Sequence, residues 1–222
     1  QPILISESVP GGTTTAQAVM EAFGLRVSNL LGSSLFKAPR DLKRKVVQKG
    51  LSNANFKSNF DSFDVVAAVG DPFQAFSMGL LIGARSVNQT VILAGGSQML
   101  AVIVLVLEFL DGKNKDDFFA DIFIATTGWL VKDYSLNNLL NLINDKYDIN
   151  LLGLASPLNF KSSIYKELKD YEKGHVKEGV GAGGISLLAF LNGFKNDEIV
   201  SLCQQNLEMM KGLGQISLKK DC

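Results

Sequence analysis

The sequence is poor in the residues from which proteins build metal centres and disulfide frameworks. It contains a single histidine, His175, and only two cysteines, Cys203 and Cys222. One histidine argues against a histidine-rich metal site and against a Ser-His-Asp triad drawn from several candidates. Two cysteines form neither a disulfide framework nor a metal cluster, and they suit a reducing cytosol. We therefore expect a cytoplasmic protein.

An excess of one charge sign and a membrane-length apolar run are also absent. Lysine plus arginine and aspartate plus glutamate each number 22, so no net basic field attracts nucleic acid or an anionic membrane. The most apolar window, residues 99–110, is interrupted by Glu108 and is too short to span a bilayer. We expect neither a nucleic-acid nor a membrane partner, and we interpret this window as a buried helix.

What the sequence does contain is enough apolar material for one large core. With 46% apolar and 20% charged residues the chain is not disordered, and 222 residues fit one domain, 1–222. The chain opens at Gln1, without a methionine and directly in a strand-like run. This start leads us to expect that an upstream part has been removed.

Short unbroken apolar segments alternate with segments of helical periodicity. The segments typical of buried strands are residues 2–7, 63–69, 90–94, 121–126 and 149–155. Helical patterns occupy residues 16–23, 40–51, 73–84, 98–110, 135–144, 161–173, 185–191 and 196–211. This alternation predicts an α/β fold with an open, mostly parallel sheet and helices on both faces, a Rossmann-like three-layer arrangement. Ligands of such sheets bind at the carboxyl edge, where the loops after the strands gather.

Glycines and small hydroxyls follow the predicted strands. These positions are Glu7 with Gly11-Gly12-Thr13, Gly70-Asp71, Gly95-Gly96-Ser97, Thr126-Thr127-Gly128 and Ser156. Several glycine-rich ends with few charges favour a ligand threaded through backbone amides, such as a nucleotide. Each glycine taken alone is equally explained as a turn signal.

The first of these loops has the order of a phosphate-binding turn. Residues 8–15 place two glycines and three threonines between an apolar run and a helical segment. Helix-terminal amides and threonine hydroxyls bind phosphate in such a turn. The spacing is neither that of a Walker loop nor that of a dinucleotide fingerprint. An ordinary capped loop explains the pattern as well.

A candidate catalytic acid lies near the end of the chain. Glu178 is followed by four glycines within six positions and then by the apolar run 185–191. The glycines would let a flat ligand approach the backbone, and the helix that begins there would direct its free N–H groups toward the same space. The alternative is a glycine-rich turn before a core helix, with Glu178 as a first-turn acid that favours the helix dipole.

Together these segments resemble the nicotinate-nucleotide–dimethylbenzimidazole phosphoribosyltransferase family of cobamide biosynthesis, in particular its archaeal and cyanobacterial branch. The resemblance is carried by Glu7 with Gly11-Gly12-Thr13-Thr14 and by residues 42–47, 67–73, 92–100 and 178–182. It spans nearly the whole chain in the right order.

The resemblance implies a transferase that moves the phosphoribosyl group of nicotinate mononucleotide to a benzimidazole-type base, giving an α-ribotide and nicotinate. Glu178 would be the general base that removes the ring N–H proton of the incoming base. The scheme requires no metal and no cofactor.

The resemblance also implies binding residues for the two ends of the nucleotide. For the phosphate they are Gly11, Gly12, Thr13, Thr14 and Lys45. For the ribose and the base we expect Glu7, Gly70, Asp71, Gly95, Gly96, Ser156, Gly179 and Gly181.

Some positions depart from the family pattern. The better-known bacterial branch carries a second glycine and a glutamate where this chain has Asp71, Pro72 and Phe73, and an aspartate where it has Ala94. Family members also bring an N-terminal part that helps to build the base pocket and the dimer. We therefore expect a C-terminal fragment of a protein that is a homodimer at full length.

Two other functions stay open. A nucleotide-dependent dehydrogenase would share the alternating pattern, but it lacks support because no Gly-x-Gly-x-x-Gly follows a strand. A non-catalytic nucleotide-binding or assembly domain of the same fold would use the threonine turn, while Glu178 would do no chemistry.

Overall fold

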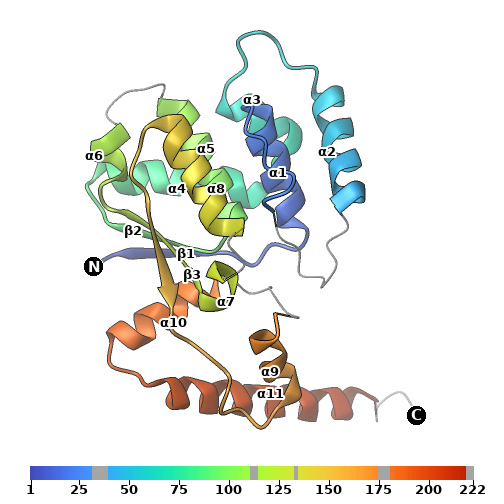
Figure 1. Cartoon of the computed structure of the whole chain (residues 1–222), viewed down its shortest axis with the longest axis vertical. Coiled ribbons are helices and arrows are strands. Elements are labelled where there is room, and N and C mark those ends of the chain that lie inside the picture. Colours follow the sequence, from blue (N-terminus) through green and yellow to red (C-terminus); the bar gives the residue numbers. More distant parts are fainter. Residues whose placement is uncertain (32–39, 111–114, 133–134, 175–180, 219–222) are drawn as a thin grey trace.

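A computed structural model describes residues 1–31, 40–110, 115–132, 135–174 and 181–218 (Figure 1). The strands are β1 (Ile3–Ser6), β2 (Val91–Ala94), β3 (Ile122–Thr127) and β4 (Leu152–Ser156). The first helices are α1 (Gly12–Ala22), α2 (Arg40–Ala54), α3 (Ser62–Val69), α4 (Pro72–Ser86) and α5 (Ser97–Leu110). The others are α6 (Lys115–Phe119), α7 (Gly128–Val131), α8 (Ser135–Tyr147), α9 (Lys166–Glu172), α10 (Ala182–Leu191) and α11 (Asn196–Leu218).

Within these residues the sheet consists of parallel strands in the order β1-β2-β3-β4. Because the order in space follows the order in the chain, right-handed crossovers place all their helices on one face. Figure 1 shows α1, α5 and α8 on that side of the sheet and α10 on the other. The predicted α/β class, with a parallel sheet covered on both faces, is confirmed.

The core on the first face is organised around α5. Every residue from Gln98 to Leu107 is buried, and the helix packs against α1, α3, α4 and α8. A helix with neighbours on all sides must be apolar all round, so the window 99–110 that the sequence predicted to be a buried helix is one. Two short helices, α6 and α7, were not predicted.

The predicted strand at residues 63–69 is wrong, because this segment forms α3. Asp61 caps the helix by accepting bonds from the backbone N–H groups of Phe63 and Asp64, and the Asp64 side chain bonds back to the Asp61 N–H. This reciprocal capping box fixes the start of a helix. Only the side of α3 that carries Ser62, Val65 and Val69 is buried, and that spacing is helical. Gly70 and Asp71 therefore do not follow a strand but join α3 to α4.

On the second face, α10 rests directly on the sheet because it presents glycines to it. A Cβ atom at Gly183 would lie 2.1 Å from the carbonyl carbon of Thr126, and one at Gly184 would lie 2.3 Å from the Cβ of Ala94. Contacts this short leave no room for any side chain. These two glycines, which suggested close approach of a flat ligand, serve close approach of helix and sheet.

A smaller apolar cluster joins the last helices to the end of the sheet. Trp129 stacks on Phe160 with ring centroids 5.2 Å apart, and its Nε1–H donates to Glu172 Oε1 over 2.9 Å. Leu158 and Val200 complete the buried part of the cluster. Across the described ranges, no helix is both long and apolar enough to cross a membrane.

We expect Gly183→Ala to lower the free energy of unfolding by roughly 1–3 kcal/mol, because α10 must lift from the backbone of β3. The matched control is Gly79→Ala, since Gly79 lies in α4 and a Cβ atom there meets nothing within 4 Å. That substitution should raise stability by about 0.5–1 kcal/mol. Urea unfolding of the three proteins measures both changes. An unchanged midpoint for Gly183→Ala would contradict the described packing of α10.

Candidate functional site

The carboxyl edge of the sheet brings Glu7 and the glycines after β2 together. The strand register pairs Ser6 with Ala94, and the N–H of Glu7 continues the ladder to the carbonyl of Ala94 over 3.1 Å. Glu7 Oε1 accepts the N–H of Gly96 at 2.9 Å. A Cβ atom at Gly95 would lie 2.6 Å from the same oxygen, so only glycine lets the carboxylate lie across the strand end.

The Glu7 carboxyl is harder to ionise than a solvent-exposed glutamate. Burial raises the pKa of Glu7 above its ordinary value of 4.5, and the negative charge of Asp71 raises it further. The hydrogen bond from the Gly96 N–H acts in the opposite direction but does not outweigh burial. Glu7 is thus a shielded acid whose protonation responds to nearby charge.

Asp71 joins this edge although it does not follow a strand. Its Oδ2 accepts the Thr15 hydroxyl at 2.5 Å and the Gln98 side-chain amide at 2.7 Å. Its Oδ1 accepts the Gln74 N–H at 3.0 Å, which caps α4. The Gln74 side chain in turn donates to Gln98 Oε1 at 2.6 Å. One carboxylate therefore fastens the starts of α1, α4 and α5 to one another.

Sequence reasoning missed Thr15, Gln74 and Gln98. Gln98 lies directly after the loop Gly95-Gly96-Ser97, and Thr15 follows the two threonines that were assigned to the phosphate. The only signal for Gln74 was its place three residues after Asp71, the spacing of a capping box. Nothing local indicated that these side chains meet.

The start of α1 has the backbone that an anion site needs. Gly11 adopts φ +74°, a left-handed conformation that favours glycine, and no side chain caps the helix. A Cβ atom at Gly12 would lie 2.5 Å from the Gln98 side-chain nitrogen, so Gly12 permits close packing of α1 on α5. Thr13 and Thr14 are half-buried in the first turn. This turn is suited to an anion, because helix N-terminal amides carry partial positive charge.

The structure brings together some of the predicted residues and separates others. Gly181 packs against β1, where a Cβ atom would lie 2.4 Å from Ser6 Oγ and 2.6 Å from the Glu7 carbonyl oxygen. Ser156 lies at the end of β4, which is separated from β1 by three spacings between neighbouring strands, about 14 Å. Its buried hydroxyl bonds Ser186 Oγ at 2.7 Å, so it ties α10 to the sheet.

Gly70 also has a structural explanation, since a Cβ atom there would lie 2.7 Å from the Val66 carbonyl oxygen and 2.8 Å from Gln74 Oε1. The bend between α3 and α4 needs this glycine whether or not a ligand is present. Glu178 and Gly179 lie outside the described residues.

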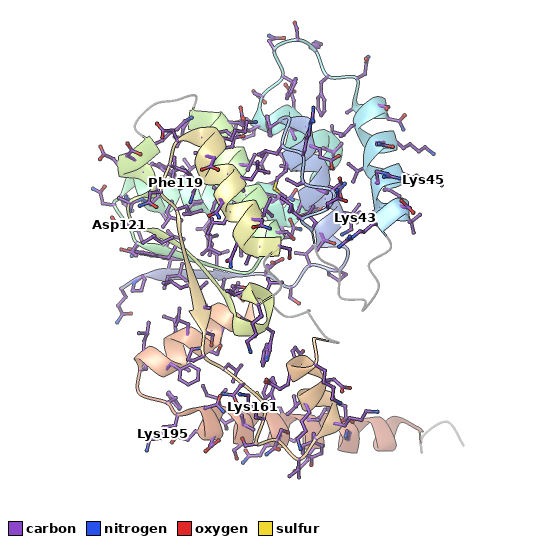
Figure 2. All side chains as sticks on the ribbon, in the orientation of Figure 1. Lys43, Lys45, Phe119, Asp121, Lys161 and Lys195 are labelled. Atoms are coloured by element: carbon purple, nitrogen blue, oxygen red, sulfur yellow. The ribbon has the colours of Figure 1, made fainter. Side chains whose placement is uncertain are left out.

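The two lysines of α2 have opposite surroundings. Lys45 is exposed and points away from α1, whereas Lys43 lies between α2 and α1 and is 8% exposed (Figure 2). Burial lowers the pKa of Lys43, and the neighbouring charge of Arg40 lowers it further. Positions 43 and 45 are two residues apart, so they fall on opposite sides of a helix. Figure 1 shows α1 and α2 side by side, both starting at the end near the sheet.

In the part of the chain that the structure describes, no three histidine, cysteine, aspartate or glutamate side chains form a group that could hold a metal ion. The described side chains at this edge are carboxylates, hydroxyls and amides.

Both the sequence and the fold of this chain are similar to those of known proteins. A sequence model of a phosphoribosyltransferase family matches residues 3–109, a stretch that includes Glu7, the turn at the start of α1, Asp71, Gly95 and Gly96. Crystal structures of CobT and of nicotinate-nucleotide–dimethylbenzimidazole phosphoribosyltransferase, both from Thermus thermophilus, superpose with TM-scores of 0.54 and 0.52. Each shares 16% identity and covers 83% of this chain, while the match covers 47% and 46% of those chains. At that identity the likeness concerns the fold.

UPF0284 proteins of cyanobacteria are similar to this chain over its whole length. Those of Prochlorococcus marinus strains MIT 9312 and AS9601 are 87% and 84% identical over all 222 residues. This chain spans 58% of the length of each of these two relatives. The family match and the shared fold confirm the resemblance to the nicotinate-nucleotide–dimethylbenzimidazole phosphoribosyltransferase family.

We expect the raised pKa of Glu7 to make stability depend on pH. The folded protein holds the Glu7 proton more tightly than the unfolded chain does, so the free energy of unfolding falls as pH rises from 4.5 through the raised pKa. Glu7→Gln keeps an oxygen for the Gly96 N–H but has no proton to lose, so it should gain stability over the wild type across that window. Urea unfolding between about pH 4 and pH 8 measures the difference.

The control for this experiment is the same comparison in an Asp71→Asn background. Removing the negative charge of Asp71 removes one cause of the raised pKa, so the gain from Glu7→Gln should shrink but not vanish. Parallel stability curves for Glu7→Gln and the wild type would show that Glu7 ionises normally.

Proposed function

We propose that the protein is a pentosyltransferase that moves the phosphoribosyl group of nicotinate mononucleotide to a benzimidazole-type base. The nitrogen of the incoming base attacks the anomeric carbon from the face opposite nicotinate. The bond from that carbon to the nicotinate nitrogen breaks, and its electron pair leaves with nicotinate. The ring N–H proton of the incoming base passes to a general base of the protein. The products are an α-ribotide and nicotinate.

One observation carries the proposal: the start of α1 and a shielded acid lie on one edge of the sheet, and each is hydrogen-bonded to the segment that begins α5. Glu7 is bonded to Gly96, while Thr15 in the first turn of α1 and Gln98 in the first turn of α5 share Asp71. A nucleotide needs contacts of these two kinds, one for its phosphate and one for its sugar. The phosphate would bind at Gly11, Gly12, Thr13 and Thr14 through the hydroxyls of the two threonines and the N–H groups of Gly11 and Thr13. The N–H groups of Gly12 and Thr14 already donate to the carbonyls of Val9 and Gly11.

The sugar end would meet Glu7. Positive charge develops at the anomeric carbon as nicotinate leaves, and a carboxylate placed beside it stabilises that charge. Such a charge would also favour the ionised form of Glu7 and so offset the effect of burial. Gly95 and Gly96 would let the ribose lie close to the backbone at the end of β2.

The general base would be Glu178. Gly181 packs against the backbone of Glu7, and Glu178 precedes it by three residues. Covalent geometry alone therefore keeps the Cα of Glu178 within about 11 Å of that of Gly181. The acid can therefore serve a base that enters above the end of β1. Gly179 would belong to the same loop.

Asp71 favours a second candidate, a non-catalytic nucleotide-binding or assembly domain. Both of its carboxylate oxygens accept hydrogen bonds within the protein, so it acts as a structural link. The position of Ala94 carries no acid either. In such a domain the helix start would bind phosphate and no bond would break.

The setting of this activity is part of the proposal. We place the enzyme in the cytoplasm and expect a homodimer in the longer protein, as the family resemblance implies. Ser156 and Gly70 have structural roles that would support the site from outside it.

We expect Glu178→Ala to lower kcat by about 10²–10⁴-fold, the usual contribution of a general base, while nicotinate mononucleotide still binds. Release of nicotinate in the full protein with several benzimidazoles measures turnover, and calorimetry measures donor binding. Asp116→Ala, which removes an exposed carboxylate of α6, is the control and should leave both unchanged. Full turnover in Glu178→Ala would exclude the assigned base, and donor binding without turnover in the wild type would favour the non-catalytic domain.

A second pair of variants tests the phosphate end. Lys43→Gln should weaken binding of nicotinate mononucleotide more than Lys45→Gln, because a charge shielded between two helices is screened less than an exposed one. Calorimetry with nicotinate riboside, which lacks the phosphate, separates a lost phosphate contact from a change in fold. A larger loss for Lys45→Gln would restore the assignment that the family motif implies. If each variant loses as much affinity for the riboside as for the mononucleotide, neither lysine contacts the phosphate.

A further inference from the structure

A cavity of about 120 Å³ lies on the helix-covered face of the sheet, away from the start of α1. Strands β3 and β4 line one side of the cavity and helix α8 lines the other. The walls are mainly apolar, with Leu100, Ile124, Leu136 and Leu140 among the lining side chains. The polar side chains that line it are Thr126 and Asn137.

Thr126 contributes to this cavity a hydroxyl group without a hydrogen-bond partner among the described residues. Its side chain is 2% exposed, and its Oγ1 has no hydrogen-bond partner among the described residues. Buried hydroxyls almost always have a partner, because an unsatisfied one is costly. Two other atoms share this state, Gln17 Oε1 and Ser77 Oγ, but neither residue lines the cavity. The Thr126 hydroxyl is therefore an unpartnered group placed where a ligand can reach it.

The size and lining of the cavity select the ligand. An apolar cavity of about 150 Å³ stays dry and binds benzene, so 120 Å³ holds a single six-membered ring. Water is a poor occupant of mostly apolar walls, because it needs two to four polar partners. A hydroxyl can donate one bond and accept others, so it can meet either a phenolic O–H or a ring nitrogen.

Thr126, which lines the cavity, lies in the same row of paired residues across the sheet as Glu7. The register aligns Ser6, Ala94, Ala125 and Leu154, so Glu7, Gly95, Thr126 and Ala155 form the next row. Successive side chains of a strand alternate between faces, which puts Thr126 on the same face as Glu7. Two strand spacings separate them, about 10 Å.

We propose that this cavity binds one six-membered aromatic or heteroaromatic ring whose single polar atom forms a hydrogen bond with Thr126 Oγ1. The proposal is independent of the transferase reaction, since no contact with Glu178 or with the start of α1 enters it.

The test is a titration of the full protein with phenol, pyridine and benzene, followed by amide chemical shifts in NMR spectra. All three rings should bind saturably and shift residues of β3, β4 and α8. Thr126→Val keeps the shape of the side chain but removes the hydroxyl. It should weaken phenol and pyridine roughly five- to tenfold, the effect of one net hydrogen bond, and leave benzene unchanged.

Two further variants complete the test. Ser77→Ala removes another unpartnered hydroxyl outside the cavity and should change no affinity. Gly153→Val adds a side chain directed at Leu140, since a Cβ atom there lies 3.2 Å from Leu140 Cδ2, and it should block all three rings. Circular dichroism checks that each variant is folded, and if Gly153→Val is not, Thr126→Val decides alone.

The proposal is overturned if the folded wild type binds no ring saturably, or if the shifts cluster away from β3, β4 and α8. It is also overturned if Thr126→Val binds phenol and pyridine as well as the wild type does. Because these outcomes do not involve nicotinate release, the transferase can fail while this site stands, and the reverse.

Discussion

The Asp71 carboxylate is the contact on which the carboxyl edge depends. It accepts bonds from Thr15 and Gln98, which are 56 and 27 residues away in the chain, and from the backbone of Gln74. These donors belong to the first turns of three helices. Bonds to a charged acceptor are stronger than neutral ones, so one side chain holds the three helix starts in register. Glu7, directly after β1, lies close enough for the negative charge of Asp71 to raise its pKa.

Strand order explains why the site is not a crevice between two neighbouring strands. Ligands of doubly wound sheets bind where the strand order reverses, and the described strands run in sequence without a reversal. Every crossover then uses the same face, and the other face is left to the segment after β4. That segment returns as α10, which contacts all the described strands. Gly181, directly before α10, consequently packs against Ser6 and Glu7 at the end of β1.

Glycine has two different uses in this protein. At Gly11 the left-handed backbone opens the first turn of α1, which is a conformational need. At Gly183 and Gly184 the need is space, because the helix backbone lies against the strand backbone. The same residue type thus meets a need for a left-handed backbone in one place and a need for space in another. Only the neighbours in space separate the two.

The sequence alone determined the elements that local pattern encodes. Unbroken apolar runs predicted β1, β2 and β3 and the buried α5, because a segment enclosed on all sides must be apolar throughout. The same rule misassigned residues 63–69, where a short apolar run did not distinguish a helix from a strand and the capping pair of Asp61 and Asp64 decided. Glycines and hydroxyls after the strands correctly indicated the edge at which Glu7, Gly95 and Gly96 meet.

Tertiary structure decided which side chains meet at that edge. Thr15 and Gln98 contact each other and Asp71 only because α1 and α5 pack together, and no local period encodes a pairing across 83 residues. The inward position of Lys43 rather than Lys45 follows from which side of α2 faces α1. The unpartnered Thr126 hydroxyl likewise depends on how α8 covers the sheet. Periodicity is a property of neighbouring residues, whereas a site is made by groups that packing brings together from distant parts of the chain.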